Sequence, residues 1–270
     1  MTDEGDAGVG LFEEGDLIRV VGREGLLIAS GGTASLLQTA HPKIAQGVYD
    51  HSCTAEDPLR RLKGTMQWVY AVMFGTREEA EWVSAAVKEM HDKVAGPGYQ
   101  ANDAELQVWV AATLFAVAVD AYGLIFRRVF TIKELESYYQ QTKIFATILG
   151  CPDGVMPETY ADFREYYVWM LGEIRISDES RAIAEQVLHP RLPLGRLNEP
   201  ALAVFRLITA GLMPDPIRVQ YGWKWDAGRE RRYRLLMGSF AVVYPHLPGR
   251  IRTLPRDYYL RTLHRRFGDA

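Results

Sequence analysis

NDAELQVWVAATLFAVAVDAYGLIF, residues 102–126, is a long apolar run near the middle of this chain. It is too long for an ordinary strand and predicts a helix, with Asn102 as the N-cap and Glu105 in a capping-box-like position. Asp120 is the only charged residue after Glu105. A helix that is apolar on nearly every face must be surrounded by other helices or by lipid, and Asp120 with the many alanines favours the first. We therefore expect a buried central helix.

Small side chains recur along this expected helix, at Ala111, Ala112, Ala116 and Ala118. Alanine allows close approach of a flat or backbone-like group, which is either a neighbouring helix or a planar cofactor. Composition alone favours helix against helix, because small apolar residues are common in protein cores.

Length and composition indicate one large globular unit. The chain has 270 residues, of which 48% are hydrophobic and 24% charged. We expect an acidic, flexible tail over residues 1–20 and a single α-helical domain over residues 21–270. The net charge of -3 provides no strong positive field, so nucleic acid is not an expected partner. Residues 214–270 are rich in arginine, which is typical of a solvated basic face but also suits anionic groups such as propionates or lipid phosphates.

The spacing of the cysteines and the composition of the first ten residues indicate where in the cell the protein is expected. Cys53 and Cys151 lie far apart and in no CxxC pattern, so neither a disulfide framework nor a zinc site is predicted. The start MTDEGDAGVG has no positive region followed by an apolar one, as a signal peptide would, and no segment is a clean membrane span. These features favour a soluble, cytoplasmic protein.

The remaining pattern predicts an all-α class, with eight or nine helices and negligible strand. Thr76 and Thr131 each begin a capping box that opens a helix. His41 and Pro42 separate two short helical pieces, because proline ends the first and suits the opening turn of the second. Residues 16–25, DLIRVVGREG, alternate loosely and predict a short extended or irregular arm.

No short motif identifies a reaction. GxSxG, HExxH, Walker and GxGxxG patterns are missing from the sequence, and its six histidines are isolated. Arg61 and Thr65 are four residues apart and so project from one helical face. A guanidinium and a hydroxyl there can hold an anionic group or a polar oxygen species, although a solvated surface explains them as well.

The order of several segments resembles the oxygenase family that includes latex clearing protein (rubber oxygenase) and MpaB. The resemblance covers roughly residues 30 to 175 and rests on ordered segments rather than on one pattern. These segments are LLQTAHPKIAQGVYDHS, DPLRRLKGT, FGTREEAEWV, MHDKVAGPGYQANDAELQVWVAATL and YYQQTKIFATILGCPDGVMPETYADFREYY.

The resemblance implies an α-helical fold that encloses a b-type haem and activates dioxygen at the iron. The arginine and threonine of the family's RxxxT pattern match Arg61 and Thr65. The family's proximal haem histidine lies in WVHATL, where this chain reads WVAATL and has Ala111 at the ligand position. Gly64 stands where the rubber-cleaving member has a distal lysine. Because alanine cannot ligate iron, these departures bear directly on cofactor and activity.

Other side chains are candidates to replace the missing ligand. His91 and His41 both lie in segments that match the family, and they are the metal-ligand candidates. Each also has an ordinary role, since His91 can bond carbonyls at a helix end and His41 can cap the next helix. Tyr99 and Tyr122 can ligate as phenolates, although a tyrosine on an apolar helix is usually core.

Asp120 is costly to bury alone, so we expect a cationic or hydrogen-bonding partner, with Arg127 and Arg61 as candidates. The functional hypothesis is a haem-dependent oxidoreductase of the oxygenase family acting on a hydrophobic small molecule such as a terpenoid or polyketide. The alternatives are a haem-free binding protein or pseudoenzyme that retains the fold, and a cofactor-independent enzyme using Arg61, Thr65 and a histidine.

Overall fold

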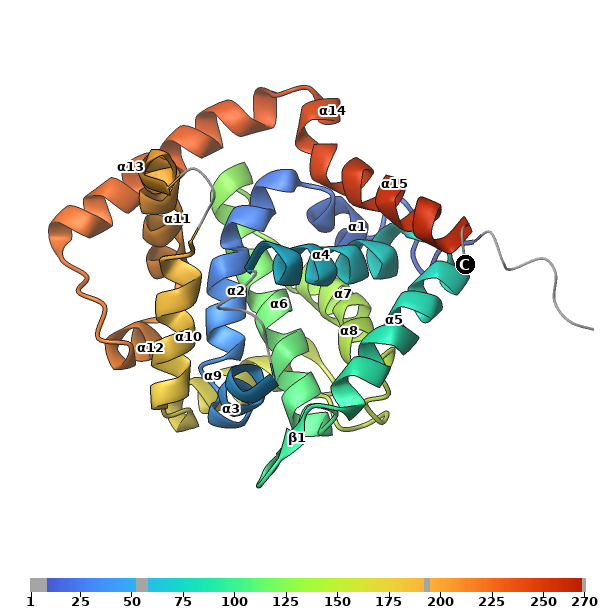
Figure 1. Cartoon of the computed structure of the whole chain (residues 1–270). Helices are drawn as coiled ribbons and strands as arrows, with labels where there is room; N and C mark the ends of the chain where they lie inside the picture. The colour runs from blue at the N-terminus through green and yellow to red at the C-terminus, as the bar shows by residue number, and fades with distance from the viewer. Residues whose placement is uncertain (1–8, 52–57, 192–194, 269–270) are drawn as a thin grey trace, which may run out of the picture.

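Helix α6 (Ala104–Phe126) lies at the centre of the computed structural model, as the apolar run predicted (Figure 1). Most of its side chains are buried, and Trp109 is among the largest fully buried side chains. Asp103 occupies the N-cap without a side-chain capping bond. The predicted Asn102 cap is wrong, because Asn102 donates instead from Nδ2 to Asp92 Oδ1 at 2.5 Å.

The structure describes residues 9–51, 58–191 and 195–268, which are almost entirely helical. Before α6 lie α1 (Leu17–Gly22), η1 (Gly25–Ser30), α2 (Gly31–Gln38), α3 (Pro42–His51), α4 (Pro58–Phe74) and α5 (Arg77–Asp92). A hairpin of β1 (Ala95–Gly96) and antiparallel β2 (Tyr99–Gln100) joins α5 to α6. After α6 lie α7 (Ile132–Thr142), α8 (Ile144–Thr147), α9 (Tyr160–Glu173), α10 (Asp178–Leu188), η3 (Gly195–Asn198), α11 (Glu199–Leu212), α12 (Asp215–Gln220), α13 (Ala227–Val243), η4 (Tyr244–His246), α14 (Gly249–Arg252) and α15 (Leu254–Gly268).

Other helices cover α6 on most sides. Helices α2, α8, α13 and η1 pack directly on it, with α7 and α11 contributing further contacts. Trp109 Nε1 donates to the Leu37 carbonyl of α2 at 3.1 Å, which fixes the two helices against each other. The Phe115 ring packs edge-on against Phe163 of α9, with centroids 4.9 Å apart. By length and composition α6 is able to cross a membrane, yet 56% of its apolar window is buried within this fold.

Local capping explains where several helices begin. Thr76 Oγ1 accepts from Glu79 N at 3.2 Å, and the Glu79 side chain accepts from Thr76 N at 2.9 Å. Thr131 makes the same reciprocal box at the start of α7. Both predicted capping boxes are confirmed. The helix that opens at Thr131 is divided at Lys143 into α7 and the short α8.

Residues 16–25 form helix rather than the predicted irregular arm. Ile18 and Val21 lie on one face of α1 and are buried. Gln141 of α7 explains this start, because its Oε1 accepts from Ile18 N at 2.9 Å and its Nε2 donates to Asp16 Oδ1 at 2.9 Å. The folded part of the chain therefore begins before the tail boundary at residue 20. Short helices of four to eight residues, α1, α2, α8, α12 and α14, account for most of the helices beyond the expected eight or nine.

The last third of the chain curves around the outside of the bundle, with α13, α14 and α15 following one edge (Figure 1). Helix α15 packs along α4, and η1 contacts both α15 and α11. Arg252 Nη1 reaches the buried Glu24 carboxylate at 3.1 Å. Breaking such a buried pair would leave a carboxylate uncompensated, so this contact ties the outer helices to the start of the fold.

Close packing of α11 on α13 depends on a glycine. A Cβ at Gly211 would lie 2.3 Å from Tyr233 Cδ2 and 2.6 Å from Tyr233 Cγ, and Tyr233 is buried. We expect Gly211→Ala to lower the free energy of unfolding by about 1–3 kcal/mol, because the ring near its Cγ cannot move without shifting α13. Urea unfolding monitored by circular dichroism measures this change.

Gly238 on α13 supplies the matched control, since a Cβ there would meet nothing within 4 Å. Gly238→Ala is expected to raise the free energy of unfolding by about 0.5–1 kcal/mol through helix propensity alone. Equal effects of the two alanines would contradict the close contact between α11 and α13.

Candidate functional site

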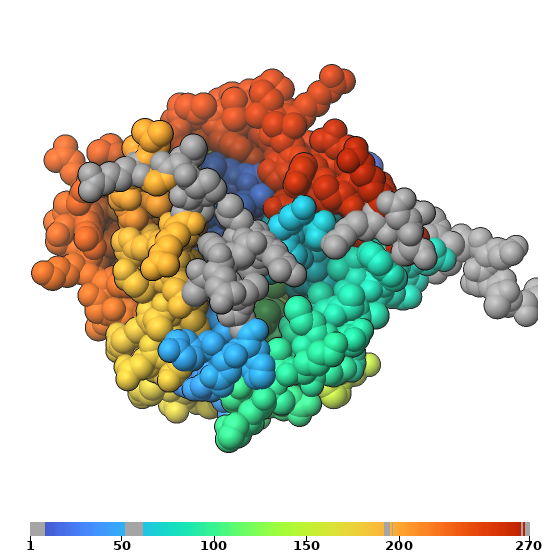
Figure 2. Space-filling model, in the orientation of Figure 1, coloured from blue at the N-terminus to red at the C-terminus, as the bar shows by residue number. Residues whose placement is uncertain are grey.

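A recess opens over α6 on the face seen in Figure 2. It lies between α3 and α5, and residues in the colour of α6 are visible at its floor. Helix α4 crosses in front of α6 in Figure 1, and the short α8 packs on both of them. Three of the segments that match the family, α3, α5 and α6, therefore border this recess.

Ala111, at the position of the family's haem ligand, is buried in the apolar core with 2% of its surface exposed. Its methyl group offers no donor to a metal. Gln107 lies one turn earlier on the same side of α6. Its Nε2 donates to the Leu149 carbonyl at 3.2 Å, whereas its buried Oε1 has no hydrogen-bond partner among the described residues. This part of the helix thus combines a buried alanine with one polar atom that is unsatisfied among the described residues.

Two imidazoles lie near the amino-terminal end of α6. His41 stands between α2 and α3, where Glu105 of the first turn of α6 acts on it electrostatically. His91 belongs to the last turn of α5 and is influenced by Asn102, just before α6. In each ring Nδ1 is buried and has no hydrogen-bond partner among the described residues.

The environment keeps both imidazoles neutral. Burial lowers the pKa of His41 below 6.5, and nearby Lys43 lowers it further. Burial also lowers the pKa of His91, against smaller opposing effects of Asn102 and Asp92. A neutral imidazole with an unoccupied ring nitrogen has the form in which histidine binds metals.

The tyrosine candidates have other partners. Tyr99 donates from its hydroxyl to Asp50 Oδ2 at 2.7 Å, and His51 Nε2 lies 3.2 Å from the Tyr99 hydroxyl oxygen. The bond to Asp50 raises the pKa of Tyr99, which disfavours a phenolate. Tyr122 stacks on Phe126 with centroids 4.4 Å apart. Neither tyrosine has the features of an iron ligand.

Helix α4 carries the positions that match the RxxxT pattern. The Arg61 side chain lies outside the described residues, and Thr65 is exposed. At Gly64, where the family member has lysine, a Cβ would meet nothing within 4 Å. A longer side chain would therefore have space at this position, where the protein has glycine.

Asp120 lies apart from the other candidates. It follows Ala111 by nine residues, which places it on the opposite face of α6, and it is about 20 Å along the axis from Glu105. No hydrogen bond or ion pair joins it to Arg127, so that predicted pair is absent from the described structure; Arg61 is not described. Asp120 is solvent-exposed, yet the protein around it still raises the pKa of its carboxyl through desolvation.

The donors near the amino-terminal end of α6 decide how a haem would fit. No group of three or more His, Cys, Asp or Glu among the described residues is arranged to hold a metal ion. Haem needs only one axial donor from the protein, and Ala111 cannot provide it. The unpartnered Nδ1 atoms of His41 and His91 are the ring nitrogens that fit this role.

Comparison with known proteins places the chain in a family. A model of the family described as "ER-bound oxygenase mpaB/B'/Rubber oxygenase, catalytic domain" matches residues 18–242. The chain belongs to this family. The match extends the resemblance seen in the sequence to α1 and to almost all of α13, and it ends before α14 and α15.

Relatives of this family member come from mycobacteria. The proteins described as uncharacterized Mb2261 of Mycobacterium bovis and Rv2237 of Mycobacterium tuberculosis are each 25% identical to it over 239 residues. The match covers 83% of this chain and 91% of each relative. No solved structure matches the chain significantly.

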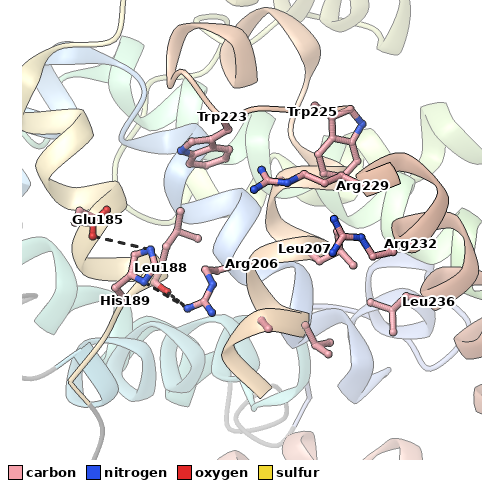
Figure 3. A pocket seen from close by; sticks show the side chains of 13 residues that line it. Glu185, Leu188, His189, Arg206, Leu207, Trp223, Trp225, Arg229, Arg232 and Leu236 are labelled. Carbon is pink, nitrogen blue, oxygen red and sulfur yellow. Dashed lines mark hydrogen bonds and ion pairs between the residues drawn. The ribbon is translucent and has the colours of Figure 1, made fainter. Parts of the chain in front are cut away.

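A cavity of about 710 Å³ lies elsewhere, between α10, α11 and α13 (Figure 3). None of the site residues proposed from the sequence lines it. Its walls include Trp223, Trp225 and three arginines, one from α11 and two from α13. The sequence shows only a basic carboxyl-terminal region here, and the WKW and GRERR segments are the local signal that points to it.

The raised pKa of Asp120 can be tested through the pH dependence of protein stability. Because desolvation raises its folded-state pKa above 3.8, the folded state binds protons more readily than the unfolded chain, and the ionised carboxylate is destabilising at neutral pH. We expect Asp120→Asn to raise the melting temperature at pH 7.5. This gain should shrink as the pH falls through the folded pKa and vanish below 3.8, where both states are protonated.

The measurement is differential scanning fluorimetry of wild type and variant from pH 7.5 to 3.5. Asp103→Asn is a suitable control, because Asp103 occupies an N-cap without a side-chain bond. A lower melting temperature for Asp120→Asn at pH 7.5 would instead reveal an ion pair, with Arg61 the remaining candidate partner.

Proposed function

We propose that this protein is an oxidoreductase of the MpaB and rubber oxygenase family that acts on a hydrophobic small molecule in the recess over α6. The observation that supports it most is the recess itself, whose floor is the apolar, alanine-rich helix of an oxygenase-type domain. An apolar hollow with few polar groups is typical of sites for apolar ligands. Terpenoids and polyketides are the substrate classes that we favour, and a cytoplasmic location is part of the proposal.

Haem b is the cofactor that we propose for this activity, and it would supply dioxygen activation at its iron. The donor would come from the wall of the recess, from His41 or His91, rather than from the central helix. Burial keeps both rings neutral, so a ring nitrogen remains able to bind at neutral pH. Ala111 and Ala112, both buried, contribute small side chains against which a flat group can lie.

Arg61 and Thr65 have the proposed role of binding a polar or anionic group at the edge of the recess. Their spacing of four residues on α4 puts them on one face of that helix. The guanidinium offers a fixed fork of donors and the hydroxyl both donates and accepts, so the pair suits an oxygen-bearing group of the substrate.

A second candidate function is a haem-free binding protein with the same fold. Ala111 favours it, because the position that ligates iron in relatives with the WVHATL pattern has lost its donor. The third possibility is a cofactor-independent enzyme that uses Arg61, Thr65 and a histidine as acid–base groups. Turnover without bound metal would distinguish it from the haem-dependent oxidoreductase and from the binding protein.

Haemin titration of the purified full-length protein tests the cofactor. We expect a Soret band with wild type that is lost or strongly shifted in either His41→Leu or His91→Leu, because removing the axial nitrogen changes the iron's ligand field. Leucine suits this test, since the buried Nδ1 atoms have no hydrogen bond to lose among the described residues. His246→Leu, at an exposed position in η4, is the matched control.

Ala111→His separates the candidate functions. If only this variant forms a stable low-spin complex, the native protein lacks an axial donor and the haem-free binding function is favoured. If both histidine variants bind haemin as wild type does, the ligand assignment to the recess wall is wrong. Failure of wild type and Ala111→His alike to bind haemin would contradict the cofactor altogether.

A further inference from the structure

The cavity between α10, α11 and α13 is separate from the recess over α6. It has a volume of about 710 Å³, within the usual range of about 300–1,000 Å³ for small-molecule sites. Its lining is mainly apolar, with Leu188 of α10, Leu207 of α11 and Leu236 of α13 (Figure 3). None of the elements that surround the recess, α3 to α6, contributes to this lining. Ligand binding in this cavity therefore does not depend on the proposed oxidoreductase function.

Two indole rings form one wall, and other side chains hold both rings in place. Trp223 stacks on Tyr221 with centroids 4.6 Å apart and planes inclined by 10°. Arg218 lies over the Trp225 ring at 4.6 Å, and Trp225 Nε1 donates to Glu230 Oε2 at 2.8 Å. A wall that is already ordered loses little conformational entropy when a ligand binds.

Arg229 and Arg232 bring positive charge to the same cavity. They are three residues apart on α13 and so lie on one face. Arg229 donates to the Lys224 carbonyl at 2.5 Å and Arg232 to the Gly228 carbonyl at 3.3 Å. Neither guanidinium forms an ion pair with a carboxylate of the described chain, which leaves most of their donors available.

The opposite wall adds a third guanidinium. Arg206 of α11 pairs with Glu199 and donates to the Leu188 carbonyl at 3.3 Å, so its position is fixed but its charge is largely compensated. Glu185 is the one acidic residue in the lining and lies 3.9 Å from His189. In Figure 3 this pair is on the side away from Arg229 and Arg232.

Carboxylates near α13 reduce the positive potential without occupying the cavity. Asp226 caps α13 by accepting from Arg229 N at 2.8 Å, and it acts electrostatically on both Arg229 and Arg232. Glu230 is engaged by Trp225 and Arg234. The cavity therefore keeps a cationic end at α13 and an apolar body between the helices.

We propose that this cavity binds an amphipathic anion, an apolar chain or ring system that carries one carboxylate or phosphate group. The apolar part lies against Trp223, Leu207 and Leu236. The anionic group binds Arg229 and Arg232, whose exposed position lets the charged end of the ligand stay near solvent. Fatty acids and lipid phosphates both have this chemistry.

Isothermal titration calorimetry of the full-length protein with dodecanoate and with dodecyl phosphate, each below its micelle concentration, tests the proposal. We expect the Arg229→Gln/Arg232→Gln double variant to bind at least about tenfold more weakly than wild type, because it loses charge-assisted hydrogen bonds. Arg231→Gln removes the same charge from α13 at an exposed residue outside the cavity lining, and it should bind within about twofold of wild type.

Two further comparisons complete the test. Dodecanol, which has the same chain without charge, should bind wild type much more weakly than dodecanoate. Tighter binding of dodecanoate than of dodecyl phosphate would indicate a fatty acid as the ligand, and the reverse order would indicate a lipid phosphate. Binding of dodecanol equal to that of dodecanoate, unchanged binding by the double variant, or no heat with either anion would overturn the proposal. Unchanged circular dichroism of both arginine variants excludes unfolding as the cause.

Discussion

Burial of α6 on nearly all sides is the constraint on which the rest of this fold depends. A 23-residue helix with a single charge after its first turn is insoluble unless other helices cover it. Helices α2, α7, α8, α11 and α13 provide that cover, and the Trp109 bond to the Leu37 carbonyl fixes the register of one of them. The outer helices close around this core, held by the buried contact between Glu24 and Arg252. Between α3 and α5, α6 is visible at the floor of a recess (Figure 2).

Local patterns predicted the central helix and the two threonine capping boxes, because each is determined by residues within one or two turns. The α1 helix was missed for the opposite reason, since its start is organised by Gln141, more than a hundred residues away. The Asn102 cap failed because α6 begins one residue later, with Asp103 at the N-cap, and the Asn102 side chain donates to Asp92 at the end of α5. The cavity lined by arginines from α11 and α13 also lay beyond sequence reasoning, because only the packing of separate helices brings those residues together.

The candidate site, too, was predicted from the sequence only in part. The resemblance identified Ala111 and pointed to two histidines, and the structure adds that both Nδ1 atoms are buried and have no hydrogen-bond partner in the part of the chain that it describes. It also separates Asp120 from them, on the opposite face of α6, which spacing along one helix could have indicated. What the sequence could not supply is burial, and burial is what keeps His41 and His91 neutral. The chain thus belongs to an oxygenase-type family without the histidine at Ala111, and our proposal relocates the haem donor from the central helix to His41 or His91.

A crystal structure of the protein reconstituted with haemin is the most direct measurement of this relocation. We predict the porphyrin in the recess over α6, with an imidazole nitrogen of His41 or His91 as the axial ligand. Haemin seated between α10, α11 and α13, or iron ligated by a residue outside the recess wall, would contradict the relocation. So would a recess that remains empty at saturating haemin, which would leave the shared helical scaffold without the family's cofactor.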